Sequence, residues 1–236
     1  RLENYIDRGR DLIMLNAFSR FEMLVGREAI EKLSRSKVAV FGVGGVGSFV
    51  VEGLARSGVG RYILVDNDLV CLTNINRQLH ATRKTIGRPK VEVMKERILD
   101  INPKAQVETH QLFFLPETAE DLLGDDIDYI VDAIDTVTAK IELVVRAKEK
   151  GIPIISCMGA GNRFDPTKLK ITDISKTHLD PLSKVMRKEL RQRGITKLKV
   201  LFSEEAPTVP DESEETSCKA GFVCPAGSDK KCLVRR

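Results

Sequence analysis

The stretch KVAVFGVGGVGSFVVEGLARSGVGRYILVD, residues 37–66, holds two apolar runs separated by a glycine-rich turn and a helical segment. The runs are Val38 to Phe41 and Tyr62 to Val65. This order predicts a strand–helix–strand unit whose backbone N–H groups and helix N-terminus meet a phosphate, because glycine lets the backbone approach closely. An acid about 20 residues further on suits a ribose hydroxyl. The stretch therefore predicts a nucleotide site formed by Gly42, Gly44, Gly45, Gly47 and Asp66.

Strands and helices continue to alternate after residue 66. Apolar runs predict strands over 107–111, 129–135 and 152–156, and helical spacing predicts helices that follow residue 89 and span 138–150. This pattern indicates an α/β fold, a Rossmann-like and mostly parallel sheet with helices on both faces and right-handed crossovers. Two further strand-like segments, within 159–174 and 197–202, flank an expected helix over 181–193. They could extend the sheet in antiparallel pairing.

Composition describes an ordinary globular protein. Of its 236 residues, 42% are hydrophobic and 31% charged, and the net charge of +4 permits a polyanionic partner without requiring one. We see no signal peptide and no apolar run approaching the roughly 18 residues that span a bilayer. Five cysteines without a secretory signal favour free thiols and a cytoplasmic location. The chain starts without Met, so either end could be truncated.

A set of polar residues is expected where the predicted strands end. A hydride-transfer site has no need for two cations and several carboxylates around its nucleotide, whereas a site that cleaves a triphosphate does. Arg and Lys neutralise the charge that builds on departing phosphates, and a carboxylate holds the magnesium ion that bridges them. The set therefore predicts ATP-type chemistry with Mg²⁺, and it comprises Asp66, Asp68, Asn74, Arg77, Gln78, Lys90 and Asp135.

Five motifs that hold these residues resemble those of the ubiquitin-activating-type (ThiF/MoeB-like) adenylyltransferases. They are GVGGVGS, LVDNDLV, TNINRQ, GRPKVEVM and DAIDTVTAK, in that order. The resemblance implies that Asp66 binds the ribose, with Asp68 beside the nucleotide, and that Asp135 holds magnesium. It implies that the triphosphate is handled by Asn74, Arg77, Gln78 and Lys90. The family is commonly homodimeric, and Arg20 aligns with an arginine that in several members reaches the partner's ATP.

A second stretch points to one branch of that family. Residues 158–191, MGAGNRFDPTKLKITDISKTHLDPLSKVMRKELR, resemble a segment of the tRNA threonylcarbamoyladenosine dehydratases. The resemblance implies that ATP activates the carboxylate of the modified nucleoside, which then closes into a ring with release of AMP and pyrophosphate. No enzyme nucleophile is needed, and Cys157, at the end of an apolar strand, suits core packing better than nucleophilic attack. The expected helix would offer tRNA, not DNA, a basic face made of Lys184, Arg187, Lys188, Arg191 and Arg193.

Two alternatives remain open from the sequence. The first is an activator of the C-terminal glycine of a small sulfur-carrier protein, and the second is a non-adenylating NAD-binding module, since the glycine pattern also fits NAD enzymes. Sulfur-carrier activators often hold zinc with two CxxC pairs. This chain has none, and the spacing of Cys218, Cys224 and Cys232 suits tetrahedral zinc poorly. A sulfur-transfer partner such as a cysteine desulfurase is also possible.

The chain is expected to divide into three segments. An N-terminal helical segment would span 1–36, the ATP-binding core 37–160, and a C-terminal extension 161–236 would complete the same domain. A run rich in acids, Pro and Ser predicts a flexible loop near 204–230.

Overall fold

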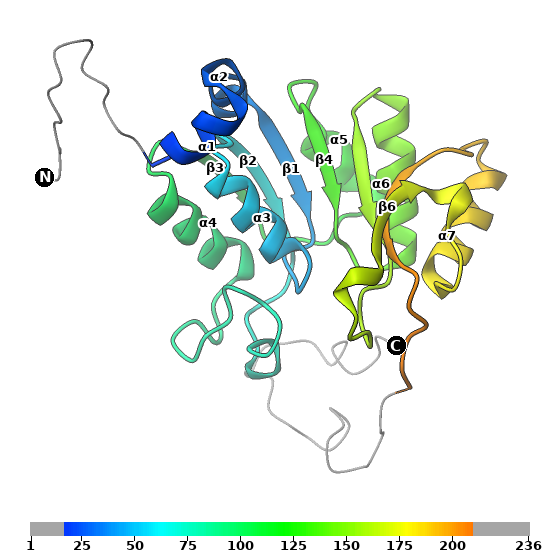
Figure 1. The fold of residues 1–236 in the computed structure, drawn as a ribbon. Helices are drawn as coiled ribbons and strands as arrows, with labels where there is room; N and C mark the ends of the chain where they lie inside the picture. Colours follow the sequence, from blue (N-terminus) through cyan, green and yellow to red (C-terminus); the bar gives the residue numbers. More distant parts are fainter. Residues whose placement is uncertain (1–16, 210–236) are drawn as a thin grey trace, which may run out of the picture.

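The computed structural model describes residues 17–209, which form one seven-stranded sheet in the order β3-β2-β1-β4-β5-β7-β6 (Figure 1). All neighbouring strands pair in parallel except β6, which runs antiparallel to β7. The predicted α/β class is therefore confirmed. Both late strands extend the sheet, but β7 pairs with β5 in parallel. The strands are β1 (Lys37–Phe41), β2 (Arg61–Val65), β3 (Gln106–His110), β4 (Tyr129–Asp132), β5 (Ile154–Cys157), β6 (Leu169–Asp173) and β7 (Lys199–Ser203).

Helices cover both faces of this sheet. In the N-terminal segment, Gly26 separates two short helices with a φ of 83°, a backbone conformation that glycine adopts readily. Residues 1–16 lie outside the described part, so the expectation for them is not addressed. The helices are α1 (Ser19–Val25), α2 (Arg27–Arg35), α3 (Gly47–Arg56), α4 (Lys90–Ile101), α5 (Ala119–Leu122), α6 (Val137–Glu149) and α7 (Pro181–Gln192), with 3₁₀ turns η1 (Leu72–Asn74), η2 (Pro116–Thr118), η3 (Pro166–Lys168) and η4 (Ile174–Lys176).

Alternating side chains divide the hydrophobic core into two layers. Val38 and Val40 of β1 face α3 and α4, whereas Ala39 and Phe41 face the layer formed by α5, α6 and α7. The strands that carry these residues are apolar on both faces because helices bury both. The sheet is continuous across residue 160, and the proposed division of the chain into segments stays a prediction.

The turn after β1 requires glycine at two positions. Gly42 has a φ of 87°, and a Cβ there would lie 2.5 Å from the carbonyl oxygen of Ala133. A Cβ on Gly47 would lie 1.9 Å from the carbonyl oxygen of Gly42. The turn therefore brings β1 against the segment that follows β4. Because crossovers leave β1 toward β2 while β4 lies on its other side, a crevice opens there at the carboxyl ends of the strands.

Within residues 17–209, no helix is both long enough and apolar enough to cross a membrane.

Candidate active site

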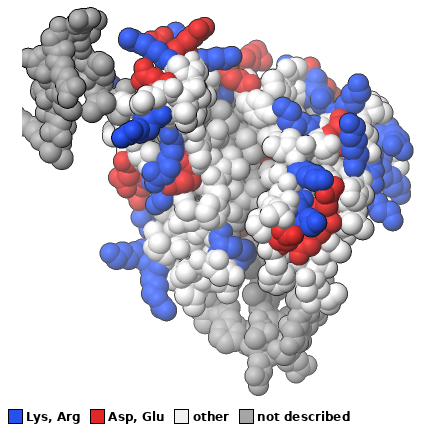
Figure 2. Space-filling view, viewed as in Figure 1, with Lys and Arg blue, Asp and Glu red and all other residues white. Residues whose placement is uncertain are grey.

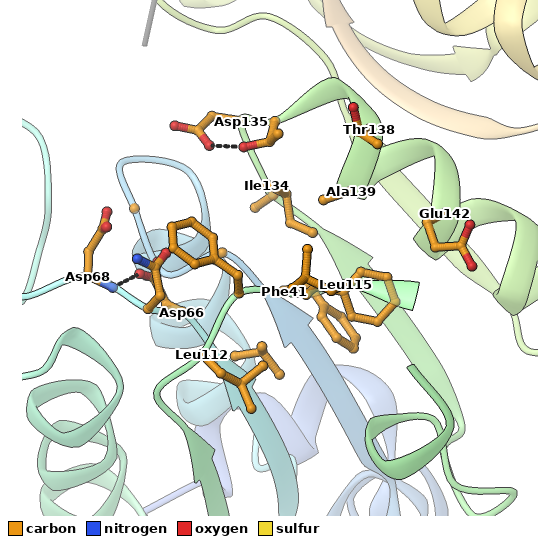
Figure 3. Close-up of a pocket in the computed structure, with 18 of the residues that line it drawn as sticks. Phe41, Asp66, Asp68, Leu112, Leu115, Ile134, Asp135, Thr138, Ala139 and Glu142 are labelled. Atoms are coloured by element: carbon orange, nitrogen blue, oxygen red, sulfur yellow. Dashed lines mark hydrogen bonds between the residues drawn. The ribbon is translucent and has the colours of Figure 1, made fainter. Parts of the chain in front are cut away.

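A pocket of about 370 Å³ opens at the carboxyl ends of β1, β2, β3 and β4 (Figure 3). In the close-up, Asp66 and Asp68 lie on one side, and Asp135, Thr138 and Glu142 lie on the other. Apolar side chains form the wall between them, including Phe41, whose ring packs edge-on against Phe114 at a centroid distance of 5.1 Å. Six residues that the sequence nominated line this pocket: Gly42, Gly44, Asp66, Asp68, Lys90 and Asp135.

Asp66 joins the end of β2 to the glycine-rich turn. Its Oδ2 accepts a hydrogen bond from the backbone N–H of Val43 (2.7 Å), and its Oδ1 accepts one from the N–H of Asp68 (2.8 Å). Burial raises the pKa of the Asp66 carboxyl, against the opposing charge of Lys90. One residue therefore shapes the turn and keeps an acceptor at the pocket.

Lys90 is the first residue of α4, and its side chain is almost fully buried. Its Nζ donates to Asp68 Oδ2 at 2.8 Å, and its backbone N–H donates to the Asp68 carbonyl at 3.1 Å. A buried ammonium with one carboxylate partner is held in a fixed position, and it can stabilise negative charge that enters the pocket.

Three more nominated residues lie on the segment after β2, next to the glycines rather than in the pocket wall. Arg77 is exposed, and its side chain passes 3.5 Å from the position a Cβ on Gly45 would take. Asn74 is buried and its Oδ1 accepts a hydrogen bond from the N–H of Cys71 (2.9 Å). Gln78 is buried, and among the described residues its Oε1 has no partner. Asn74 therefore braces the segment, whereas Arg77 passes beside the glycines with an exposed side chain.

The segment that carries Asp135 is fixed by a buried ion pair. Asp132 and Lys140 are both 0% exposed, with Nζ 3.0 Å from Oδ2. Lys140 Nζ also donates to the Ile134 carbonyl (3.1 Å), and Asp132 Oδ1 accepts from the Ile134 N–H (3.1 Å). Ser156 of β5 donates to Asp132 as well. The backbone just before Asp135 is thus held from both sides, while Asp135 itself is exposed.

A family model described as the ThiF family matches residues 18–221. The chain belongs to this family.

Relatives within the ThiF family share most of the chain. A tRNA threonylcarbamoyladenosine dehydratase of Bacillus subtilis (strain 168) is 53% identical over 197 residues, which are 83% of this chain and 78% of that protein. The E. coli tRNA N6-threonylcarbamoyladenosine dehydratase TcdA in complex with ATP matches with a TM-score of 0.78 and 38% identity, over 82% of this chain and 83% of that chain. The structure of the same enzyme in complex with AMP matches with a TM-score of 0.80 and 36% identity, over 84% of this chain and 83% of that chain. The predicted resemblance to this ThiF-family branch is confirmed.

Sequence reasoning missed the apolar wall of the ThiF-family pocket and the buried ion pair behind it. The wall comes largely from the segment after β3, and its signal was the run LFFL at 112–115, directly after a predicted strand. Both Asp132 and Lys140 lie in the motif DAIDTVTAK, in which the resemblance gives a role to Asp135 alone. The structure ends β4 at Asp132, so the two carboxylates of the motif differ completely in exposure.

Arg20 lies far from the pocket of its own chain. It is an exposed residue of α1, and α1 packs near the amino ends of the strands, where the ring of Phe18 lies 3.5 Å from the position of a Cβ on Gly58. Figure 1 shows α1 near the amino ends of the strands, whereas the residues that line the pocket follow the carboxyl ends. Arg20 therefore does not join the other nominated residues within one chain.

The nominated basic residues of α7 differ in what they contact. Arg187 is half-buried and donates to the Thr177 carbonyl (2.8 Å) and the Ile174 carbonyl (3.3 Å). Arg193 pairs with Glu189 on the same helix at 3.1 Å. The other three, Lys184, Lys188 and Arg191, are exposed. Lys184, Lys188 and Arg191 are thus the exposed cations of α7 without a carboxylate partner among the described residues, and Arg187 lines the same surface hollow with them.

Two cysteines lie within the described residues. Cys157, at the end of β5, is buried, and burial raises the pKa of its thiol to about 11. A thiol with that pKa is protonated at neutral pH and is a poor nucleophile. Cys71 is half-exposed beside η1. The remaining three, Cys218, Cys224 and Cys232, and most of the expected 204–230 loop lie outside the described residues.

Proposed function

We propose that this chain is an ATP-dependent tRNA threonylcarbamoyladenosine dehydratase. The observation that carries the proposal is the pocket at the carboxyl ends of β1 and β4, where Asp66, Lys90 and Asp135 converge. ThiF-family dehydratases of known name share this fold, and one of them binds ATP and AMP. The alternative of an NAD-binding module gives no reason for the buried Lys90, which faces the pocket beside a carboxylate.

Each residue contributes to one part of the reaction. The nucleoside carboxylate would attack the α-phosphate of ATP and release pyrophosphate, and the resulting acyl-adenylate carries AMP as the leaving group for ring closure. Asp66 would accept a ribose hydroxyl, and the turn at Gly42 and Gly44 would offer backbone N–H groups to phosphate. Lys90 and Arg77 would stabilise the charge that builds on the departing pyrophosphate. A nitrogen of the same nucleoside is the nucleophile that displaces AMP and closes the ring, so no enzyme thiol is required.

Magnesium would be held by Asp135. This carboxylate is exposed at the pocket, and one of its oxygens accepts from Thr136 Oγ1 (3.2 Å). No cluster of three or more His, Cys, Asp or Glu side chains suited to a metal occurs within residues 17–209. A single carboxylate such as that of Asp135 fits Mg²⁺, because this ion binds proteins through one or two carboxylates together with phosphates and water. The ion would neutralise phosphate charge.

The outward cations of α7 would contact the tRNA backbone. The first turn of α7 lies at the carboxyl edge of the sheet, because Asp180, its N-cap, accepts a hydrogen bond from the N–H of Gly159 after β5. Lys184, Lys188 and Arg191 then extend away from the pocket along one exposed side of the helix. A row of exposed Lys and Arg suits sequence-independent contacts to phosphates.

We also propose that the chain acts as a homodimer. Met23 and Leu24 of α1 are 78% and 83% exposed, and Phe49 of α3 is 56% exposed. On the sheet face that α3 and α4 cover, no described helix lies over β5, β7 and β6 (Figure 1). Ile171 of β6 is 65% exposed. Figure 2 shows mainly uncharged atoms over the centre of this side. A second copy covering these residues would also give Arg20 a pocket to reach, in the partner.

The location and a further partner follow as lesser proposals. The tRNA substrate and the buried free thiol of Cys157 support a cytoplasmic protein. A cysteine desulfurase as a partner stays a prediction.

The proposal is tested by AMP formation from ATP and Mg²⁺ with tRNA that carries threonylcarbamoyladenosine, and with the same tRNA lacking the modification. We expect AMP only with the modified tRNA. AMP formation that requires a small carrier protein instead, and ignores both tRNAs, would favour the sulfur-carrier activator.

A further inference from the structure

A loop beside the pocket carries two adjacent basic residues at its tip, Arg83 and Lys84. The loop connects η1 to α4. At one end, the N–H of Leu79 donates to the Oγ of Ser48 (3.2 Å), which lies in the first turn of α3, directly after the glycine-rich turn. The loop returns at Arg88, whose carbonyl accepts from the N–H of Val70 (2.8 Å). Both ends of the loop are therefore attached to elements that form the pocket.

The tip has a defined shape. The N–H of Thr85 donates to the Thr82 carbonyl (3.0 Å), which makes Arg83 and Lys84 the central residues of a turn. The Thr85 hydroxyl donates to the His80 carbonyl (2.8 Å) and accepts from the N–H of Thr82 (2.8 Å). Ala81, just before the turn, is buried against Val70 and Val93. The two cations are thus held at a fixed place relative to the pocket.

Neither cation has a protein partner within residues 17–209, and both are exposed. Three other cations near the loop behave differently, because each has a carboxylate partner. Arg88 pairs with Glu96, Lys90 with Asp68, and Arg97 with Glu52. Figure 2 shows Lys and Arg side chains projecting at the lower left of the molecule, where Figure 1 places the loop between β2 and α4. Two adjacent cations without a carboxylate attract an anion to the tip.

We propose that Arg83 and Lys84 contact backbone phosphates of the tRNA beside the nucleoside that reacts in the pocket. This inference rests on the proposed function. A modified nucleoside that enters the pocket remains joined to its neighbours, so phosphates lie close to the pocket rim on both sides. The loop that carries the tip lies at the carboxyl ends of the strands (Figure 1) and leads directly into Lys90, which lines the pocket, and both tip side chains are exposed. Such contacts position the RNA and read no bases. They would hold the strand on the β2 side of the pocket, whereas α7 begins on the β5 side.

The test is the double charge reversal Arg83→Glu/Lys84→Glu, with Lys104→Glu as a matched control. Lys104 is also an exposed cation in a turn, but between α4 and β3, at the far ends of the strands. We expect the Kd for modified tRNA and the KM for it to rise about tenfold or more in the double variant, with kcat and the KM for ATP within about twofold of wild type. The slope of log Kd against log salt should fall by about one to two. The control should match wild type.

Several results would overturn the inference. One is wild-type tRNA affinity in the double variant. A second is a KM for ATP that rises as much as the KM for tRNA, because the tip would then act through the shape of the ATP site. A third is an equal loss in Lys104→Glu. The proposed function fails separately, through wild-type protein that forms no AMP with modified tRNA, because tRNA binding is measured without ATP.

Discussion

Individual charged residues give the site its chemistry, and Arg77 lies beside the glycine-rich turn with an exposed side chain. Its guanidinium is exposed and donates to the Thr73 carbonyl (2.9 Å) and to Asn76 Oδ1 (2.9 Å). These contacts are with exposed atoms of the same loop, so exchanging them for phosphate oxygens costs little.

For Arg77→Ala we predict a fall in kcat for AMP formation of about 100-fold or more, because a cation that stabilises departing phosphate is removed. Affinity for tRNA should change far less. Arg77→Lys keeps the charge and should retain more activity than Arg77→Ala. The measurement is release of AMP and pyrophosphate at saturating tRNA, and unchanged turnover in Arg77→Ala would remove Arg77 from the first step.

His80, on the loop between η1 and α4, makes the stability of the fold depend on pH. It is 3% exposed, both ring nitrogens lack partners among the described residues, and burial, with the charge of Lys90, lowers its pKa from 6.5 to about 4. The folded protein therefore holds it neutral, whereas the unfolded chain binds a proton below pH about 6.5. The stability linked to His80 is complete above pH 6.5 and is lost as the pH falls toward 4.

We predict that wild type loses up to about 3 kcal/mol more of its free energy of unfolding than His80→Leu does between pH 7 and pH 4. Denaturant titrations across this range give the measurement, and comparing slopes with pH removes any constant cost of the substitution. Parallel curves for the two proteins would contradict the neutral, buried state of His80.

The sequence motifs predicted which residues lie at the pocket. They did not predict the contacts that each side chain makes. A strand end followed by Asp66 or Asp135 places a carboxylate at the carboxyl edge, because parallel strands end there together. Spacing does not show where a side chain turns. Asn74 faces inward to brace its own turn, and Arg187 faces the backbone before α7, although both read as ligand contacts in the sequence.

Among the elements, the turn between β1 and α3 tolerates least change. Gly42→Ala would introduce a Cβ 2.5 Å from a carbonyl oxygen at a φ of 87°. Gly53, within α3, is exposed and has no atom within 4 Å of the position its Cβ would take. It provides a matched control in the same unit.

We predict that Gly42→Ala lowers the free energy of unfolding by about 2 kcal/mol or more and weakens ATP binding. Gly53→Ala should raise it by about 0.5–1 kcal/mol, because alanine favours the helix interior. Thermal unfolding and ATP titration of both variants test this. Equal stability of the two variants would contradict the steric clash between a Cβ at position 42 and the Ala133 carbonyl oxygen.

Periodicity predicted every strand of the described sheet but not every neighbour. Apolar runs and turn residues define where a strand lies along the chain. Which strand pairs with β7, and in which direction, depends on contacts across the sheet between residues far apart in the sequence. The antiparallel pairing considered for the two late strands therefore holds between β6 and β7, whereas β7 pairs with β5 in parallel.

At the scale of the whole molecule, the placement of Arg20 away from its own pocket makes a prediction about the assembly. A protein with Arg20→Ala keeps a pocket that lacks only the partner's arginine, and a protein with Asp66→Asn can donate that arginine. Mixing the two inactive variants after dissociation should restore about a quarter of wild-type activity, since half of randomly formed dimers are mixed and each has one complete site.

Activity of the mixture no greater than that of the separate variants would show that Arg20 does not act across an interface. Leu24→Glu, on the exposed side of α1, is the accompanying control. It should shift the protein from dimer to monomer in sedimentation velocity and should prevent restoration.

The central claim, that the chain dehydrates threonylcarbamoyladenosine in tRNA at the expense of ATP, is tested most directly by the mass of the nucleoside itself. Modified tRNA would be incubated with the protein, ATP and Mg²⁺, then digested gently and analysed by mass spectrometry. We predict that the nucleoside loses one water, only when ATP is present, and in proportion to the AMP formed. A nucleoside of unchanged mass in a reaction that forms AMP would contradict the claim.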